Sequence, residues 1–148
     1  MASSDLWIAP DVVPTITYTD LSRAIEWLVR VFGFRERADA RLTWPDGGMT
    51  WLEVGTGLLN IATPDETWAK GLAGGVIKVY VDDVDEHFSR AKAGGATIVS
   101  PPQDGFWGGR IYRALDHEGH RWEISQRGRD LPAHRWRLPP RVTRGAAG

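Results

Sequence analysis

Hydrophobic and polar positions along the chain follow one pattern twice. Residues 13–32 begin with alternating apolar and polar side chains and continue with apolar residues at helical spacing. Residues 76–93, which lie 63 positions further along, follow the same pattern. The same offset relates Leu59–Ile61 to Trp122–Ile124. Because one offset aligns a strand, a helix start and a later strand, the chain is predicted to contain two copies of one structural unit.

The first copy spans residues 12–63 and predicts the order strand, helix, strand, strand, strand. Asp20 is a suitable N-cap for a helix over residues 21–32, and Gly33 is suited to end it. A turn is expected at residues 45–48, where proline, aspartate and two glycines follow one another. The four predicted strands cover residues 12–19, 34–43, 49–54 and 58–63.

The second copy spans residues 76–127 and predicts the same order. Asp83 caps a helix over residues 84–93, and two glycines follow it. Residues 101–109 are predicted to be a mobile loop in which Trp107 covers a flat ligand by stacking; burial of Trp107 at a subunit contact is the alternative. The four predicted strands cover residues 76–82, 96–100, 110–115 and 120–126.

Three further segments lie outside the two copies. Residues 1–11 are expected to be a lead-in, and residues 64–75 a linker. Residues 128–148 are rich in arginine and proline, which predicts an extended or poorly ordered basic tail, pinned in part by Trp136.

The composition limits the class of protein. With 148 residues, of which 42% are hydrophobic, the chain can bury one substantial core. The formal net charge of −1 gives no reason to expect nucleic acid or an acidic membrane as a partner, although residues 127–148 alone carry about +5. The absence of cysteine excludes disulfides, thiolate metal sites and cysteine nucleophiles. No apolar run has the length of a membrane span, so a cytoplasmic protein is expected.

Eight tryptophans are more than a core of this size needs. Trp27 and Trp122 fall on apolar faces and are predicted core residues. Five others lie beside proline, glycine or polar residues. They are expected at the rim of a ligand site or at a subunit contact, where an apolar ring with one polar N–H is useful. These five are Trp44, Trp51, Trp68, Trp107 and Trp136.

Three motifs carry a resemblance to a known family. Residues 20–34 open with Asp-Leu-Ser-Arg-Ala and close with Val-Phe-Gly-Phe, and residues 81–96 run from Val-Asp-Asp-Val-Asp to Ala-Gly-Gly-Ala. Residues 116–123 read Asp-His-Glu-Gly-His-Arg-Trp-Glu, close to a closing pattern Asp-Pro-x-Gly-His-x-Trp-Glu. Residues 12–127 therefore resemble the glyoxalase/bleomycin-resistance/extradiol-dioxygenase superfamily, also called vicinal oxygen chelate (VOC) proteins. Residues 100–110 most resemble its PhnB-like and small-molecule resistance branch.

The resemblance implies an α+β fold of two tandem βαβββ modules, which form a curled, half-barrel mixed sheet around a concave cavity. Many members are homodimers, so a homodimer is expected. Metal-dependent members hold their ligands at positions that correspond here to Val13, Asn60, Val76 and Glu123. Only Glu123 is a good ligand, whereas a divalent ion needs about three His or carboxylate ligands. The cavity is therefore expected to hold no metal; a bound divalent ion is the less favoured alternative.

The histidines do not complete a metal site. His87 lies on the second predicted helix, His134 lies in the tail, and His117 and His120 flank the turn at Gly119. His120 and Glu123 differ in strand parity and so point to opposite faces. We expect His120 to stabilise its own turn by a hydrogen bond.

Strand alternation predicts which side chains face the cavity. Glu123 is costly to bury unpaired and is expected to pair with Lys78 or with the neighbouring Arg121. Two interpretations of Glu123 stay open: a polar anchor or proton-transfer group acting with Lys78 and Tyr80, or a structural salt bridge. The complete set of predicted ligand-binding residues is Val13, Thr15, Thr17, Trp51, Asn60, Val76, Lys78, Tyr80, Trp107, Arg121 and Glu123.

The function expected from this pattern is binding of a small apolar or aromatic molecule in a metal-free cavity, as in sequestration of an antibiotic or natural product. The alternative is a VOC enzyme of the lyase, isomerase or dioxygenase type, which either recruits a metal or uses Glu123 as acid or base. A third reading is a structural or regulatory module whose own side chains fill the cavity. The expected partners are a small-molecule ligand and a second copy of the chain, with neither nucleic acid nor a membrane.

Overall fold

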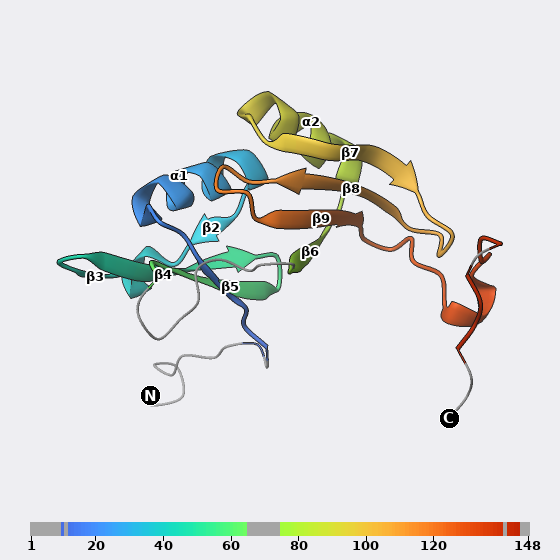
Figure 1. Cartoon of the computed structure of the whole chain (residues 1–148), viewed down its shortest axis with the longest axis horizontal. Helices are drawn as coiled ribbons and strands as arrows, with labels where there is room; N and C mark the ends of the chain where they lie inside the picture. The colour runs from blue at the N-terminus through green and yellow to red at the C-terminus, as the bar shows by residue number, and fades with distance from the viewer. Residues whose placement is uncertain (1–9, 11, 65–74, 141, 146–148) are drawn as a thin grey trace. The chain divides into compact units, whose positions relative to one another are not determined.

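The computed structural model describes residues 10, 12–64, 75–140 and 142–145, which fall into two compact units. Unit 1 comprises the described residues up to Gly75 together with His117–His120, and unit 2 comprises the other described residues from Val76 onward. Within the described residues, each unit holds one α-helix and one mixed sheet (Figure 1). The predicted lead-in and linker, with Trp68, lie almost wholly outside the described residues.

Unit 1 combines helix α1 with a five-stranded sheet. Its elements are β1 (Thr15–Thr17), α1 (Leu21–Phe32), β2 (Arg35–Glu36), a 3₁₀ turn (Ala38–Ala40), β3 (Leu42–Trp44), β4 (Gly47–Val54) and β5 (Gly57–Ala62). The strand order is β1-β5-β4-β2, and β3 pairs with β4. β1 runs parallel to β5, and the other pairs are antiparallel. The first strand of the unit therefore lies beside its last.

Unit 2 combines helix α2 with a four-stranded sheet. Its elements are β6 (Val76–Val81), α2 (Val84–Gly94), β7 (Thr97–Asp104), β8 (Arg110–Leu115), β9 (Arg121–Gln126) and a 3₁₀ turn (Ala133–Arg135). The strand order is β6-β9-β8-β7, with β6 parallel to β9 and the other pairs antiparallel. This order is that of unit 1, strand for strand.

The two sheets repeat one another at the level of single residue pairs. Thr15 pairs with Asn60 between β1 and β5, and Lys78 pairs with Glu123 between β6 and β9. Both members of the second pair lie 63 positions after those of the first. The predicted α+β fold of two βαβββ repeats is therefore confirmed.

Both helices begin and end at the predicted signals. The side chain of Asp20 accepts a hydrogen bond from Arg23 N, and that of Asp83 accepts one from Glu86 N. Gly33 and Gly95 end the helices in the left-handed conformation, with φ of 77° and 105°. Among the residues that the structure describes, neither α-helix is long and apolar enough to cross a membrane.

Strand alternation sorts the side chains of unit 1 into a core face and an opposite face. Ile16, Tyr18 and Ile61 are fully buried together with the apolar side of α1, which includes Leu28 and Val31. Burial of this apolar surface is the main stabilising contribution to the unit. The predicted core face is therefore correct, and the alternate residues of β1 and β5 point away from α1.

The predicted strand over residues 34–43 is wrong. The structure has a two-residue strand, β2, then a 3₁₀ turn, and then β3, which forms a hairpin with β4. The Arg37-Ala38-Asp39-Ala40 stretch has no alternation of apolar and polar residues and little β propensity, so it turns instead of extending. The hairpin carries Trp44 back over the start of β4.

The predicted loop over residues 101–109 is also shorter in the structure. β7 continues through Pro101 and Pro102 to Asp104, with one register shift against β8 between Ile98 and Ser100 and another between Ser100 and Gln103. Proline lacks an N–H but is tolerated in an edge strand and at bulges, and β7 is the edge of its sheet. Only residues 105–109 form the turn, which is closed by a hydrogen bond from Gly105 N to Gly109 O at 2.8 Å.

The turn between β8 and β9 belongs to unit 1. Glu118 accepts hydrogen bonds from Thr19 N at 2.9 Å, from Thr19 Oγ1 at 3.0 Å and from Asp20 N at 3.3 Å. His117 stacks on the Tyr18 ring with centroids 5.7 Å apart, and His120 meets the same ring edge-on with centroids 4.7 Å apart. His120 Nε2 lies 2.8 Å from Thr17 O, so it ties the turn to β1, a longer-range role than the predicted local one.

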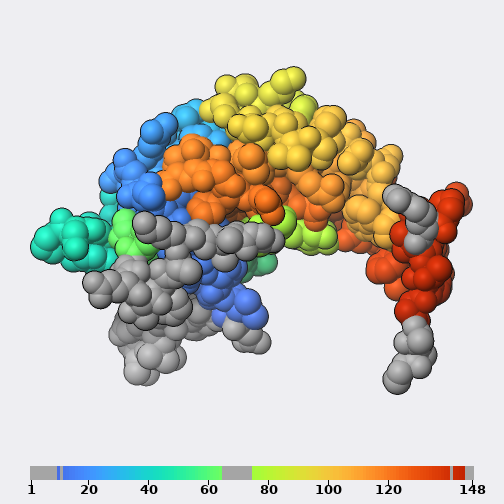
Figure 2. Space-filling view, in the orientation of Figure 1, coloured from blue at the N-terminus to red at the C-terminus, as the bar shows by residue number. Residues whose placement is uncertain are grey.

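The C-terminal segment, residues 128–140, has no strand or α-helix and is largely exposed, but hydrogen bonds tie it to the turn at Trp107 in unit 2. Leu131 N donates to Trp107 O at 2.8 Å, and Arg137 N donates to Phe106 O at 3.1 Å. The ring of Trp136 meets that of Phe106 edge-on at 6.1 Å, as expected of a residue that pins the segment. In Figure 2 the red atoms of this segment adjoin the gold atoms at the end of β7.

Candidate functional site

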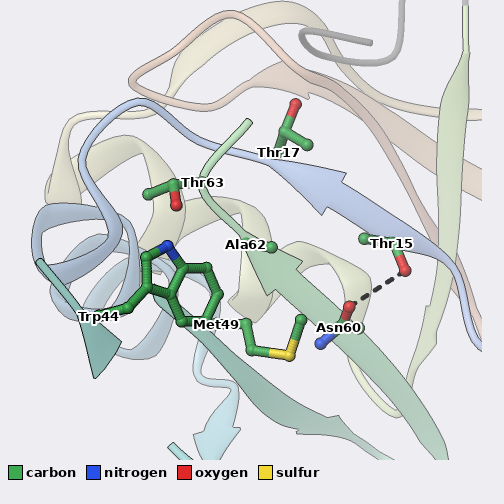
Figure 3. A pocket seen from close by; sticks show the side chains of 7 residues that line it. All are labelled: Thr15, Thr17, Trp44, Met49, Asn60, Ala62 and Thr63. Atoms are coloured by element: carbon green, nitrogen blue, oxygen red, sulfur yellow. Dashed lines mark hydrogen bonds between the residues drawn. The ribbon is translucent and has the colours of Figure 1, made fainter. Parts of the chain in front are cut away.

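A cavity of about 120 Å³ lies in unit 1, on the face of the sheet that α1 does not cover. It is bounded by β1, β3, β4 and β5. Figure 3 shows the lining side chains converging, with Trp44 and Thr63 at one end and Thr15 and Asn60 at the other. The lining residues are Thr15, Thr17, Trp44, Met49, Asn60, Ala62 and Thr63.

Asn60 is the most firmly oriented polar group of the cavity. Its side chain is 8% exposed, accepts a hydrogen bond from Thr15 Oγ1 at 3.1 Å and donates one from Nδ2 to Thr50 O at 3.1 Å. These contacts use one of its two amide protons and one lone pair of its oxygen. The amide can therefore offer a donor and an acceptor to a bound molecule without rearranging.

Trp44 can lie over the cavity because Gly47, at the start of β4, has no side chain in its way. A Cβ on Gly47 would lie 2.7 Å from Trp44 Nε1 and would overlap Thr63 Oγ1. Thr63 Oγ1 in turn accepts from Gly48 N at 3.1 Å. With 42% of its surface exposed, Trp44 presents an apolar ring for a flat group to stack on.

The lining is chemically neutral. Trp44, Met49 and Ala62 supply apolar surface, while three threonine hydroxyls and one amide supply hydrogen bonds. None of these side chains ionises near neutral pH, so the cavity offers no general acid or base of its own. This chemistry suits an uncharged, largely apolar group with a few polar atoms.

The structure brings together some of the predicted ligand-binding residues of unit 1. Thr15, Thr17 and Asn60 line the cavity as predicted. Trp51 pairs with Asn60 in register and is half-buried, and Val13 is half-buried ahead of β1, but neither is among the lining residues.

Four lining residues were not in the predicted ligand-binding set, although one of them, Trp44, was among the tryptophans expected at the rim of a ligand site or at a subunit contact. The four are Trp44, Met49, Ala62 and Thr63. Strand parity could have found two of them, because Met49 lies two positions before Trp51 and Ala62 lies two positions after Asn60. Trp44 depended on the unforeseen hairpin of β3 with β4.

The predicted residues of unit 2 form a line of charges across its sheet. Glu123 lies between two cations: Lys78 Nζ is 3.1 Å from Oε2, and the Arg113 guanidinium is 3.0 Å from Oε1. Lys78 was a predicted partner, whereas Arg121 was the wrong alternative to it. Arg121 precedes Glu123 by two positions, but the residues in register with Glu123 on the neighbouring strands are Lys78 and Arg113.

Three other predicted residues of unit 2 lie apart from that line. The hydroxyl of Tyr80 donates to Asp130 Oδ2 at 2.6 Å. Trp107 lies in the turn between β7 and β8, where its ring packs over Gly105. Val76 opens β6 and is 54% exposed.

The donor groups at the four inherited ligand positions do not fit a metal. In unit 1 these are the aliphatic Val13 and the neutral amide of Asn60, which is a weak ligand beside histidine or carboxylate. In unit 2 they are the aliphatic Val76 and Glu123, whose two oxygens face cations. No group of three or more histidines or carboxylates that could hold an ion occurs within the described part of the chain.

Tyr80 is expected to ionise above its usual range, because the hydrogen bond to Asp130 and partial burial raise its pKa. The bond is intact below the ordinary tyrosine pKa of about 10 and is lost as the pH rises through the raised value. A spectrophotometric phenolate titration of Asp130→Ala should show one tyrosine ionising earlier than in the unchanged chain. Tyr112, whose pKa burial raises, serves as an internal control that the substitution leaves alone. Identical titrations of the two proteins would contradict the assignment.

Comparisons with known proteins agree with this architecture. The profile of the Glyoxalase/Bleomycin resistance protein/Dioxygenase superfamily matches residues 11–124. An uncharacterized protein of Mycobacterium bovis is 30% identical over 135 residues, which cover 84% of this chain and 88% of that protein. An uncharacterized protein of Mycobacterium tuberculosis H37Rv is also 30% identical over 135 residues, which cover 84% of this chain and 78% of that protein.

Two solved structures are similar to the whole double repeat. TioX from Micromonospora sp. ML1 is 41% identical, with a TM-score of 0.67, over 80% of this chain and 98% of TioX. A superfamily member from Sphaerobacter thermophilus has a TM-score of 0.64 at 24% identity over 82% of this chain and 99% of its own, which shows the fold alone. The repeat, the matching profile and these neighbours confirm the predicted resemblance: the chain belongs to the Glyoxalase/Bleomycin resistance protein/Dioxygenase superfamily.

Proposed function

We propose that the protein binds a small, largely apolar or aromatic molecule in the cavity of unit 1 without a metal, and that it thereby sequesters an antibiotic or another natural product. The observation that carries the proposal is the neutral lining, in which Trp44 and Met49 face the hydrogen-bonding edge of Asn60. Apolar burial supplies the affinity in such a site, and one oriented amide supplies orientation.

The size of the cavity supports partial insertion of the ligand. Pockets that enclose a drug-sized molecule have volumes of roughly 300–1,000 Å³. A cavity of about 120 Å³ accepts one ring or a comparable group. The exposed face of Trp44 then lies beside the part of the ligand that stays outside, where it stacks on a flat system.

Binding is favoured over catalysis because the cavity lacks titratable side chains. An acid-base mechanism needs a group that exchanges protons near the working pH, and the lining offers hydroxyls and an amide instead. The proposal includes the homodimeric state and the cytoplasmic location expected for such a binding protein. Light scattering of the purified chain tests the first of these.

Trp44→Leu is expected to weaken ligand binding about tenfold, since it removes the stacking surface while keeping the rim apolar. Hits from a thermal-shift screen of flat aromatic natural products, with and without EDTA, would be titrated against both proteins. Trp51→Leu is the matched control, because Trp51 is also a partly exposed tryptophan of unit 1 but is not among the lining residues. The proposal fails if EDTA abolishes binding, or if the two tryptophan variants bind alike.

A further inference from the structure

Unit 2 repeats the frame that makes the cavity of unit 1. β1 and β5 correspond to β6 and β9 with an offset of 63 positions. β4 corresponds to β8 with an offset of 62 positions. The reason is that Trp51 of β4 pairs with Asn60, whereas Arg113 of β8 pairs with Glu123. The residues that line the unit 1 cavity from these strands are Thr15, Thr17, Met49, Asn60 and Ala62. Their counterparts in unit 2 are Lys78, Tyr80, Ile111, Glu123 and Ser125.

A tryptophan covers the start of the same strand in both units. In unit 1, a Cβ on Gly47 would meet the Nε1 of Trp44. In unit 2, the counterpart of Gly47 is Gly109, and a Cβ there would meet the Nε1 of Trp107. Trp107 therefore occupies the position in unit 2 that Trp44 occupies beside the cavity of unit 1.

The C-terminal segment fills the space beside Trp107. A Cβ on Gly109 would lie 2.6 Å from Asp130 Oδ1, and the other oxygen of Asp130 accepts from the Tyr80 hydroxyl at 2.6 Å. Leu131 follows, and its N donates to Trp107 O at 2.8 Å. A carboxylate and an apolar side chain of the chain itself thus lie where unit 1 has an open cavity.

The strand beside Tyr80 holds a buried hydroxyl that has no hydrogen-bond partner among the described residues. Ser125 is in register with Tyr80 and Ile111 and is 2% exposed. Its Oγ is buried, and none of the described residues hydrogen-bonds it. Buried hydroxyls are almost always satisfied in folded proteins, so this one points to a polar atom that the described part of the chain does not supply.

We propose that unit 2 contains a second small-molecule site, formed by Tyr80, Trp107 and Ser125 and filled in this structure by Asp130 and Leu131 of the same chain. The occupant defines the chemistry of the ligand: an acidic group takes the place of the Asp130 carboxylate at Tyr80, and an aromatic or apolar group takes the place of Leu131 beside Trp107. Lys78 and Arg113 outnumber Glu123 on the same face and favour an anion. This proposal goes beyond the function proposed for unit 1 and uses none of its residues.

The ligand and the segment compete for one space, so weakening the segment should raise affinity. The probe is 8-anilinonaphthalene-1-sulfonate, which joins a flat aromatic system to an anionic group. Asp130→Ala is expected to bind one probe molecule per chain at this site about tenfold more tightly than the unchanged chain does, because a charge-assisted hydrogen bond no longer holds the segment. Leu131→Ser, which removes the apolar half of the occupant, should act in the same direction and serves if Asp130→Ala does not fold.

Asp82→Ala is the matched control for Asp130→Ala. It removes the same charge from an exposed position of the same unit, so any general rise in affinity for an anion appears equally in both. Combining Asp130→Ala with Trp44→Leu separates this site from the unit 1 cavity, because Trp44→Leu weakens binding in the unit 1 cavity and leaves this site unchanged. Equal probe affinity in Asp130→Ala, Leu131→Ser and Asp82→Ala would overturn the proposal.

Hydrogen exchange provides a second test on the unchanged chain. The amides of Leu131 and Arg137 donate to Trp107 O and Phe106 O when the segment is docked. Saturating probe should raise their exchange rates about tenfold, because a displaced segment loses these bonds. The amide of Asn60, which donates to Pro14 O in unit 1, should not change. Full protection of Leu131 at saturating probe would show that the probe does not displace the segment and would sink the proposal.

Discussion

Replacing Glu123 by alanine is expected to lower the free energy of unfolding by about 2 kcal/mol. The Glu123 side chain is 13% exposed and bridges Lys78 and Arg113, so its removal takes away two charge-assisted contacts. The two cations are about half exposed and recover water, which keeps the loss below that of a fully buried pair. Urea unfolding at low and high salt measures the effect, and salt should shrink it.

Glu26→Ala is the control for this prediction. Glu26 pairs with Arg30 on the exposed surface of α1, where an ion pair contributes about 0.5 kcal/mol or less. If Glu123→Ala lowered the free energy of unfolding no more than Glu26→Ala does, the ion pairs of Glu123 with Lys78 and Arg113 would not stabilise unit 2. Glu123→Gln separates the two interpretations that the sequence left open: a structural salt bridge predicts unchanged ligand binding, and a ligand anchor predicts weaker binding.

The repeat and its faces could be predicted because they depend on periodicity within single segments. Alternation in residues 13–18 placed Ile16 and Tyr18 on the buried face, and both are fully buried. The offset of 63 then fixed the equivalence of Asn60 and Glu123, which the strand registers reproduce. Helix ends followed from Asp20 and Asp83, whose side chains cap the first turns as expected.

Contacts across strands and between distant segments could not be predicted from such patterns. Arg113 meets Glu123 only because β8 and β9 pair in one register, which no local spacing reveals. The C-terminal segment looked unstructured because arginine and proline dominate it, yet Leu131 and Trp136 dock it on the turn at Trp107. Tertiary packing outweighed composition in this segment.

The candidate site was predicted only in part, because some of its residues come together through contacts across strands. The inherited metal positions directed attention to Asn60, which does line the cavity, and to Val13, which does not. Trp44 and Thr63 come to the cavity through the hairpin of β3 with β4, whose turn brings Gly47 beneath the indole.

Replacing Gly47 by alanine is expected to lower the free energy of unfolding by about 2 kcal/mol and to weaken ligand binding in the unit 1 cavity about tenfold, as Trp44→Leu does. The added Cβ would overlap Thr63 Oγ1 and lie 2.7 Å from Trp44 Nε1, so both side chains must move. Thr63 is held by Gly48 N, and displacing it breaks that hydrogen bond. The indole is the freer of the two, and its movement removes the stacking surface of the cavity.

Gly57→Ala separates this effect from the general consequence of removing a glycine. Gly57 opens β5 in the same sheet, and a Cβ there would meet only Val54 O, at 3.3 Å. Both substitutions reduce the conformational freedom of the unfolded chain alike. The free energy of unfolding of Gly57→Ala should therefore lie within about 0.5 kcal/mol of that of the unchanged protein. Calorimetric unfolding and ligand titration of the two variants give the comparison. If Gly47→Ala bound ligand as tightly as Gly57→Ala, the Trp44 ring would not form part of the binding surface, since the substitution cannot leave that ring in place.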